Sequence, residues 1–96
     1  MATFITLVNF TDQGIRTIKD SPDRFEAFRA LAENFGVSVK TAYYTQGQYD
    51  LVLIVEGSEE GAMSALLKVA SLGNVRTQTL RAFSVGEMRK IIGNIA

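Results

Sequence analysis

The sequence predicts an α+β protein of the ferredoxin-like type, with a four-stranded antiparallel sheet and a short C-terminal helix. Runs of β-branched and aromatic residues alternate with segments of helical periodicity, in the order strand, helix, strand, strand, helix, strand. Gly47 and Gln48 separate the two middle strands, a spacing that is typical of a tight β-hairpin. We find no linker, repeat or low-complexity segment, so residues 1–96 are expected to form one domain.

In the first half, residues 3–10 (TFITLVNF) predict a strand because they are rich in β-branched and aromatic side chains. Thr11 and Asp12 offer an N-cap for a helix that is interrupted before Pro22. Ser21 is expected to cap a second helical segment with Pro22 in its first position. The apolar positions expected to form the helical stripe before Gly36 are Ile15, Ile18, Phe25, Phe28, Ala32 and Phe35.

In the second half, strands are predicted over residues 37–46, 49–56 and 75–83. Ser58 is expected to cap the intervening helix and Gly73 to end it in a left-handed conformation. The expected apolar face of that helix consists of Ala62, Met63, Leu66, Leu67 and Ala70. Residues 84–87 (SVGE) match a capping box and predict a last helix, with Met88, Ile91, Ile92 and Ile95 on one side.

If the hairpin turn consists of the two residues Gly47 and Gln48, then Gln46 lies opposite Tyr49 and Thr45 lies opposite Asp50. This register assigns one face of the hairpin to Val37, Val39, Thr41, Tyr43, Thr45, Asp50, Val52 and Ile54. It assigns the other face to Lys40, Ala42, Tyr44, Gln46, Tyr49, Leu51, Leu53 and Val55. A three-residue loop would exchange the two faces, and both loops remain open at this stage.

The strands over 3–10 and 49–56 are apolar on both of their faces. Two helices cover only one face of a four-stranded sheet, whereas a strand that is apolar on both faces is typical of a strand buried on both. We therefore expect a second copy of the chain to cover the other face, giving a homodimer or a higher homo-oligomer.

The composition excludes several kinds of site. The chain has no cysteine and no histidine, which excludes thiol catalysis, zinc or haem sites built on thiolate or imidazole, and Ser-His triads. Glu59-Glu60 lies at a predicted helix start, where the helix dipole accounts for it, so no metal and no cofactor are expected. Ten basic and ten acidic residues leave no net charge and no basic patch, so binding of nucleic acid is not expected. Neither a membrane span nor a signal peptide is predicted, and a cytoplasmic location is therefore expected.

Three longer segments, FTDQGIRTIKDSPDR (10–24), GQYDLVLIVEG (47–57) and SLGNVRTQTLRAF (71–83), resemble the GYD domain family. The Gly-Tyr-Asp motif that names the family occurs here with one inserted residue, as Gly47-Gln48-Tyr49-Asp50. The resemblance implies a member of the dimeric α/β-barrel group, in which two ferredoxin-like sheets pack face to face. That group includes cofactor-independent monooxygenases, isomerases, haem enzymes and ligand-sensing domains, so the resemblance implies no particular activity.

The candidate ligand-binding residues are Tyr43, Tyr44, Tyr49, Asp50, Arg76 and Arg81. Asp50 would act as a general base or bind a ligand, or it would accept hydrogen bonds from the turn or Thr45, or pair with an arginine. We expect a mainly structural role in which Asp50 anchors the hairpin and Tyr49 packs beside Gln46 and Leu51. The tyrosine rings suit either a pocket wall or a dimer core.

Arg76 and Arg81 are five residues apart on one predicted strand, so they should lie on opposite faces of the sheet. Arg76 would bind a carboxylate or phosphate, or pair with Asp50 or a glutamate. Helical spacing also sets Asp12 against Arg16 and Asp20 against Arg24 as ion pairs on a solvated face. Gly14 lies inside this helix at a cost of about 1 kcal/mol against alanine, which indicates that another group approaches the backbone closely here.

Three classes of function remain open from the sequence alone. The first, which we favour over an enzyme, is a small-molecule-binding or oligomeric regulatory module. The second is a cofactor-independent oxygenase or isomerase that acts in the cleft between the two sheets of a homodimer, and the third is a structural or regulatory oligomer that binds no ligand. A cavity with converging polar groups would favour a ligand, whereas tight apolar packing would favour a structural role. The expected partners are a second copy of the chain and a small-molecule ligand.

Overall fold

The computed structural model describes residues 1–95. The elements are β1 (Ala2–Phe10), α1 (Asp12–Arg16), the short 3-10 helix η1 (Ile18–Asp20), α2 (Ser21–Glu33), β2 (Ser38–Tyr44), β3 (Leu51–Gly57), α3 (Glu59–Ala70), β4 (Val75–Ala82) and α4 (Val85–Gly93). The predicted order of strands and helices is confirmed, and the fold is ferredoxin-like. β2 begins one residue later and ends two residues earlier than predicted, and β3 begins two residues later.

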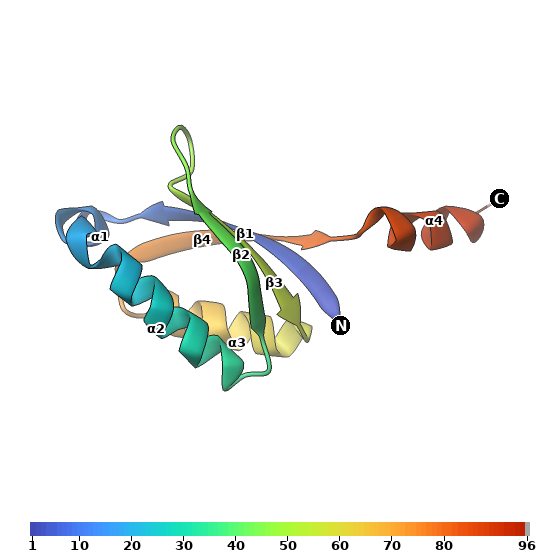
Figure 1. Ribbon diagram of the computed structural model, residues 1–96, viewed down its shortest axis with the longest axis horizontal. Coiled ribbons are helices and arrows are strands. Elements are labelled where there is room, and N and C mark those ends of the chain that lie inside the picture. The colour runs from blue at the N-terminus through green and yellow to red at the C-terminus, as the bar shows by residue number, and fades with distance from the viewer. Residues whose placement is uncertain (96) are drawn as a thin grey trace.

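The four strands form one antiparallel sheet in the order β2-β3-β1-β4. Helices α2 and α3 lie side by side against one face of this sheet, and no helix covers the opposite face within residues 1–95 (Figure 1). We call that opposite face the open face. Helix α4 extends away from the sheet beyond the end of β4, and the molecule measures 52 × 31 × 18 Å along its principal axes.

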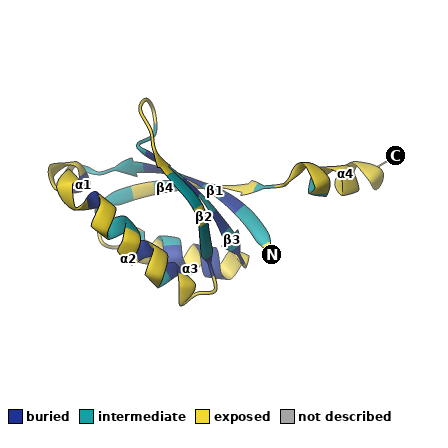
Figure 2. Ribbon diagram, in the orientation of Figure 1, coloured by how far each residue is buried: buried dark blue, intermediate teal, exposed yellow. Residues whose placement is uncertain are grey.

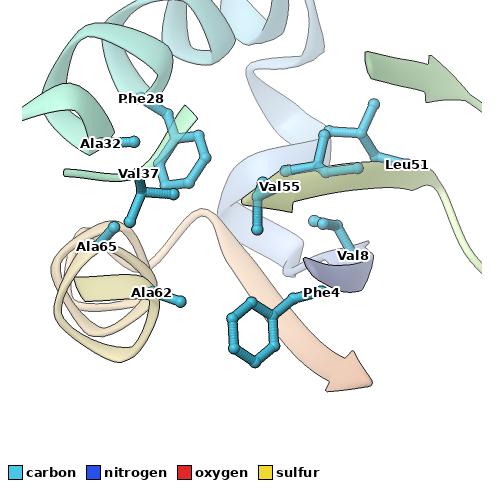
Figure 3. Close-up of a cluster of buried hydrophobic side chains, with 10 residues drawn as sticks. Phe4, Val8, Phe28, Ala32, Val37, Leu51, Val55, Ala62 and Ala65 are labelled. Carbon is cyan, nitrogen blue, oxygen red and sulfur yellow. The ribbon is translucent and has the colours of Figure 1, made fainter. Parts of the chain in front are cut away.

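The hydrophobic core lies between the sheet and helices α2 and α3. Alternate residues of β1 and β3 are buried on this side, and small residues of the helices meet them (Figure 3). The buried apolar residues are Phe4, Val8, Phe28, Ala32, Val37, Leu51, Leu53, Val55, Ala62 and Ala65. Burial of each large side chain in this set contributes about 1.5–3 kcal/mol to folding.

The start of α2 differs from the prediction. Ser21 is the first helical residue rather than the N-cap, and Asp20 is the N-cap without a side-chain hydrogen bond. The Ser21 hydroxyl is buried and shares a hydrogen bond with the Tyr44 hydroxyl at 2.8 Å. Ser21 was predicted as the N-cap because a serine followed by a proline is common there. In the structure its hydroxyl bonds to Tyr44 of β2 and does not cap the helix.

The predicted face of α3 is wrong at three positions. Met63, Leu67 and Ala70 are exposed, whereas Gly61, Ala62 and Ala65 are buried. A Cβ on Gly61 would lie 2.4 Å from the carbonyl oxygen of Phe35, so the small-residue side of α3 is the side that fits against the rest of the molecule. Three residues predicted on the apolar stripe before Gly36 are also exposed, namely Ile15, Ile18 and Phe35.

The predicted hairpin register is confirmed near the turn, where Tyr44 pairs with Leu51 and the Thr45 N–H donates to the Asp50 carbonyl at 2.9 Å. The register then shifts by one residue between Val39 and Thr41. This bulge at Lys40 reverses the alternation of side chains, so Val39 pairs with Val55 on the helix-covered side. The prediction that Val37 and Val39 share a face with Thr41 and Tyr43 is therefore wrong, and Val37 is in the core.

Helix α4 has the predicted capping box, in which the Ser84 side chain accepts from the Glu87 N–H and the Glu87 carboxylate accepts from the Ser84 N–H. Its apolar side chains are exposed, as are most residues of this helix (Figure 2). They are Val85, Met88, Ile91 and Ile92, followed by Ile95 just beyond the helix.

Candidate functional site

The loop before β4 holds helix α1 through several hydrogen bonds. The Thr11 N–H donates to the Asn74 carbonyl at 3.1 Å, and the Thr11 hydroxyl donates to the Gly73 carbonyl at 2.6 Å. The amide of Gln13 donates to the Leu72 carbonyl at 3.1 Å and to the Asn74 side-chain oxygen at 2.9 Å. The motif TDQG is thus joined directly to the motif SLGN, although the two are far apart in the sequence.

Gly14 provides the close approach that the sequence predicted. A Cβ at this position would lie 1.9 Å from the carbonyl oxygen of Asn74, far inside van der Waals contact. Gly14 is buried, and its N–H donates to the capping hydroxyl of Thr11 at 3.1 Å. Glycine is therefore required here by the backbone of the loop that precedes β4.

Asp50 connects the β2-β3 hairpin to the end of β1. Its Oδ2 accepts a hydrogen bond from the Phe10 N–H at 2.9 Å, and its own N–H donates to the Val8 carbonyl at 2.8 Å. The side chain of Asn9 donates to the Gln48 carbonyl at 2.8 Å, which adds a third link at the same place. The donor to the carboxylate is on β1, and not in the turn or on Thr45 as expected. The Thr45 hydroxyl donates to the Tyr49 carbonyl instead.

The three tyrosines do not converge on one pocket. Tyr43 pairs with Val52 on the open face and is 68% exposed, whereas Tyr44 lies on the helix-covered side and reaches Ser21. The Tyr49 hydroxyl donates to the side-chain oxygen of Gln78 on β4 at 3.1 Å. Gln78 lies on the open face, because its neighbours along β4 point to the helix-covered side. Tyr49 therefore reaches the open face, and the prediction that it packs on the side of Leu51 is wrong.

The prediction that the two arginines of β4 lie on opposite faces is confirmed. Arg81 pairs with Phe4 on the helix-covered side, its guanidinium carbon lies 5.7 Å and 4.4 Å from the ring centres of Phe4 and Phe83, and it donates to the Thr3 carbonyl at 3.2 Å. Arg76 pairs with Asn9 at the border of the open face. It also lines a shallow depression of about 390 Å³ together with residues of α1 and Gly73.

The ion pairs expected from the sequence, which are Asp12 with Arg16, Asp20 with Arg24, and Arg76 with Asp50 or a glutamate, are not formed within residues 1–95. There, the pair Lys40–Glu56, with 3.7 Å between nitrogen and oxygen, is the one salt bridge. Arg24 does not pair with Asp20 but donates to the Thr17 carbonyl at 3.0 Å, the Thr17 hydroxyl at 2.9 Å and the Gly14 carbonyl at 3.2 Å. This arginine therefore joins α2 to the end of α1.

The open face carries a band of apolar side chains across all four strands. The strand register aligns one row of Tyr43, Val52, Leu7 and Gln78 with a second row of Thr41, Ile54, Ile5 and Leu80. A polar row lies beyond each side of this band, with Asn9 and Arg76 on one side and Ser38, Glu56 and Thr3 on the other. We call the two inner rows the apolar band. An apolar centre bordered by polar residues is the usual anatomy of a protein interface.

The more enclosed cavity lies on the other side of the sheet. It has a volume of about 170 Å³ and lies between the sheet and helices α2 and α3. Most of its lining is apolar, with a few polar residues that include Ser21, Arg24 and Asn74. Tyr43 and Arg76 are on the opposite face and do not line it. The cavity is therefore separate from the candidates on the open face.

Within residues 1–95 there is no group of three or more acidic side chains arranged to hold a metal ion. In the same part of the chain, none of the helices has the length and apolar character needed to cross a membrane.

Residues 4–92 match the GYD domain. The chain belongs to the GYD domain family. A protein of Thermus thermophilus, named glutamine synthetase and cystathionine beta-lyase binding protein, is 39% identical over 90 residues, which cover 92% of this chain and 95% of that protein. The resemblance stated from the three motifs is therefore confirmed.

Solved structures show the same fold. The crystal structure of FFRP-DM1 has a TM-score of 0.58 at 23% identity and covers 86% of this chain and 100% of that one. The feast or famine regulatory protein of M. tuberculosis, complexed with L-methionine, has a TM-score of 0.64 at 19% identity and covers 88% of this chain and 52% of that one. These likenesses show the ferredoxin-like fold of the chain.

Several residues that build this region were absent from the list of candidates. They are Thr11, Gln13, Asn74 and Gln78, which provide most of the hydrogen bonds between the three motifs, and Asn9, which bonds to the Gln48 carbonyl from just before the first motif. The signal that could have found them was present, because all except Asn9 lie inside the motif segments that resemble the family.

Proposed function

We infer that this chain is a protein-binding regulatory module that works as a homodimer, joined through the apolar band of the open face. The observation that carries the proposal is the band itself, which places Ile5, Leu7, Val52, Ile54 and Leu80 on a face that no helix of residues 1–95 covers. A second copy related by a two-fold axis would present the same band and the same polar borders. Its apolar rows would then be removed from water in both copies.

The class of partner is supported by the relative from T. thermophilus, whose name states that it binds glutamine synthetase and cystathionine beta-lyase. That relative matches nearly the full length of this chain. Enzymes of these two kinds are therefore the proposed partners. The hydrogen bonds of Asp50 and Tyr49 support a structural role for the motif that names the family, since each group has a partner within the same chain.

The test is a binding measurement by biolayer interferometry, with this chain immobilised and with glutamine synthetase and cystathionine beta-lyase from the source organism in solution. Native chain should bind at least one enzyme saturably, and an unrelated dehydrogenase of similar size should not bind. The matched control variant is Lys19→Ser, which changes an exposed residue of η1 and should leave binding unaltered. Absence of saturable binding to both enzymes would contradict the proposal.

The second candidate is a cofactor-independent oxygenase or isomerase acting in the cleft between two sheets. Tyr43 favours it, because its exposed ring lies on the open face and would line that cleft in a dimer. Arg76 borders the same face. The two candidates are distinguished by Tyr43→Phe, which should abolish turnover of a substrate if the hydroxyl takes part in chemistry and should leave enzyme binding intact if the chain is a regulatory module.

A further inference from the structure

The cavity between the sheet and helices α2 and α3 has the size of a small binding pocket. Its volume is about 170 Å³, and twelve of its seventeen lining residues are apolar. An apolar cavity of roughly 150 Å³ in another protein stays dry and takes up benzene. Phe28 of α2 and Val8 and Leu51 of the sheet belong to the hydrophobic layer between the sheet and the two helices (Figure 3), and all three line the cavity. The space therefore suits a single apolar group about the size of an aromatic ring.

One charged side chain lines the cavity, that of Arg24. Its guanidinium is held in place by the neutral oxygens of Thr17 and Gly14, at 2.9–3.2 Å. No carboxylate lies within ion-pair distance of it in residues 1–95, where the one salt bridge joins Lys40 and Glu56. The lining of the cavity therefore includes one arginine, and its positive charge has no counterion from this part of the chain.

Two neutral polar groups lie near this arginine. The backbone carbonyl of Asn74 closely approaches Gly14, and the Gly14 carbonyl in turn accepts from Arg24. Asn74 also lines the cavity. Ser21 precedes Arg24 by three residues on α2, so the two side chains lie on neighbouring turns of one helix face. Polar groups are thus gathered where α1, the start of α2 and the loop before β4 meet, while Leu53, Leu66 and Val69 supply apolar walls.

We propose that this cavity binds a small monocarboxylate, whose apolar body enters between α2, α3 and the sheet and whose carboxylate pairs with Arg24. The guanidinium is charged at all relevant pH values and is well suited to a carboxylate. The site is formed by one chain and lies on the face opposite the apolar band. It therefore depends neither on dimer formation nor on binding of an enzyme partner.

The first test compares phenylacetate with phenylacetamide, two probes of nearly equal shape that differ in charge. Isothermal titration calorimetry at neutral pH should show binding of phenylacetate, with the amide weaker by about tenfold or more because it cannot form the charge-assisted pair. Methyl NMR spectra should show the largest shifts at Leu53, Leu66 and Val69. Absence of phenylacetate binding up to about 10 mM, a weak affinity by any standard, would overturn the proposal. Equal binding of the two probes, or shifts confined to the open face, would overturn it as well.

The second test uses two pairs of variants. Val69→Phe should fill the cavity and abolish phenylacetate binding, whereas Met63→Phe, on the exposed side of the same helix, should leave it unchanged. Arg24→Gln should weaken phenylacetate about tenfold and leave the amide unaffected, whereas Arg89→Gln on α4 should change neither. Thermal unfolding of each variant establishes that it is folded. If Arg24→Gln does not fold, the comparison of the two probes on the native chain decides the proposal. Unchanged binding in folded Val69→Phe would overturn it.

Discussion

Asp50 and Gly14 each fix one contact between segments that are distant in the sequence. Asp50 Oδ2 accepts from the N–H of Phe10 at the end of β1, and Gly14 allows the carbonyl of Asn74 to approach α1. Together they hold the β2-β3 hairpin, the end of β1 and the start of β4 at one end of the sheet. The residues that mark the family motifs therefore have structural partners, and substitutions at these positions should be read first as changes in stability.

For Asp50 we expect Asp50→Asn to lower the free energy of unfolding by about 1 kcal/mol, because an amide oxygen still accepts from Phe10 but without the negative charge. Asp50→Ala should cost more, about 1–3 kcal/mol, since the Phe10 N–H then loses its partner. Urea denaturation measures both variants. Asp23→Asn, an exposed change on α2, is the control and should stay within about 0.5 kcal/mol of the native chain. Binding to the proposed enzyme partner should persist in Asp50→Asn; lost binding with unaltered stability would show that the carboxylate acts on a ligand.

For Gly14 we expect Gly14→Ala to be destabilising, although alanine favours a helix by about 1 kcal/mol. The added methyl group would overlap the Asn74 carbonyl, and overpacking of this kind typically costs about 1–3 kcal/mol or more. Gly93→Ala is the control, because that glycine also lies in a helix and has open space around its Cβ position. Thermal unfolding should show a lower midpoint for Gly14→Ala and an equal or higher midpoint for Gly93→Ala. A native-like midpoint in Gly14→Ala would mean that α1 is not held against the loop.

Part of these residue-level contacts could be predicted from the sequence. Gly14, a glycine inside a helix, indicated a close approach. The approaching atom, the carbonyl oxygen of Asn74, belongs to a loop far along the chain and leaves no local signal in the sequence. The same holds for Asp50, since its donor is on β1 and not in the adjacent turn. Tyr49 was placed on the wrong side because alternation was extended into the turn, where the chain no longer follows the strand.

At the scale of elements, the sequence predicted every strand and the longer helices because hydrophobic periodicity and caps are local signals. It could not predict the bulge at Lys40, since nothing in the alternation of residues 37–46 marks an extra residue. The predicted buried side of α3 was also wrong. Large apolar side chains such as Met63 suggest a buried face, whereas close packing against the rest of the molecule requires the small residues Gly61 and Ala65 there. Hydrophobicity alone does not determine which side of a helix fits its neighbours.

The cap of α4 provides a prediction at this scale. The Ser84 N–H donates to the Glu87 carboxylate at 2.8 Å, and this bond holds the pKa of that carboxyl below its usual value of 4.5. Because the pKa is lower in the folded than in the unfolded chain, the stabilisation of α4 is present above the unfolded value and is lost as the pH falls through the folded value.

We therefore expect the amides of α4 to lose protection only as the pH is lowered below 4.5, because the pKa of the Glu87 carboxyl lies below that value. NMR measurements of the Glu87 carboxyl carbon and of hydrogen exchange in α4 check this. In Glu87→Gln the protection of α4 should be lower at neutral pH and should change little on acidification. A Glu87 carboxyl that titrates at or above 4.5 would contradict the assigned bond.

At the scale of the whole molecule, the two faces of the sheet have different surroundings. Helices α2 and α3 cover one face, and the apolar band lies on the other. Helix α4 adds a second apolar surface, with Met88, Ile91 and Ile92 exposed beyond the end of β4 (Figure 2). A sheet that is apolar on both faces was predicted from the sequence, and a second copy of the chain was inferred from it. A dimer through this face remains the central proposal.

Sedimentation equilibrium at micromolar concentration tests that proposal most directly. The native chain should have a mass of about 21 kDa, twice the 10.5 kDa of one copy. Ile54→Glu should sediment as a monomer because it places an unpaired charge in the middle of the apolar band. Met63→Glu, on the exposed side of α3, should remain a dimer. A native chain that sediments at 10.5 kDa, or an Ile54→Glu variant that remains a dimer, would contradict the proposal.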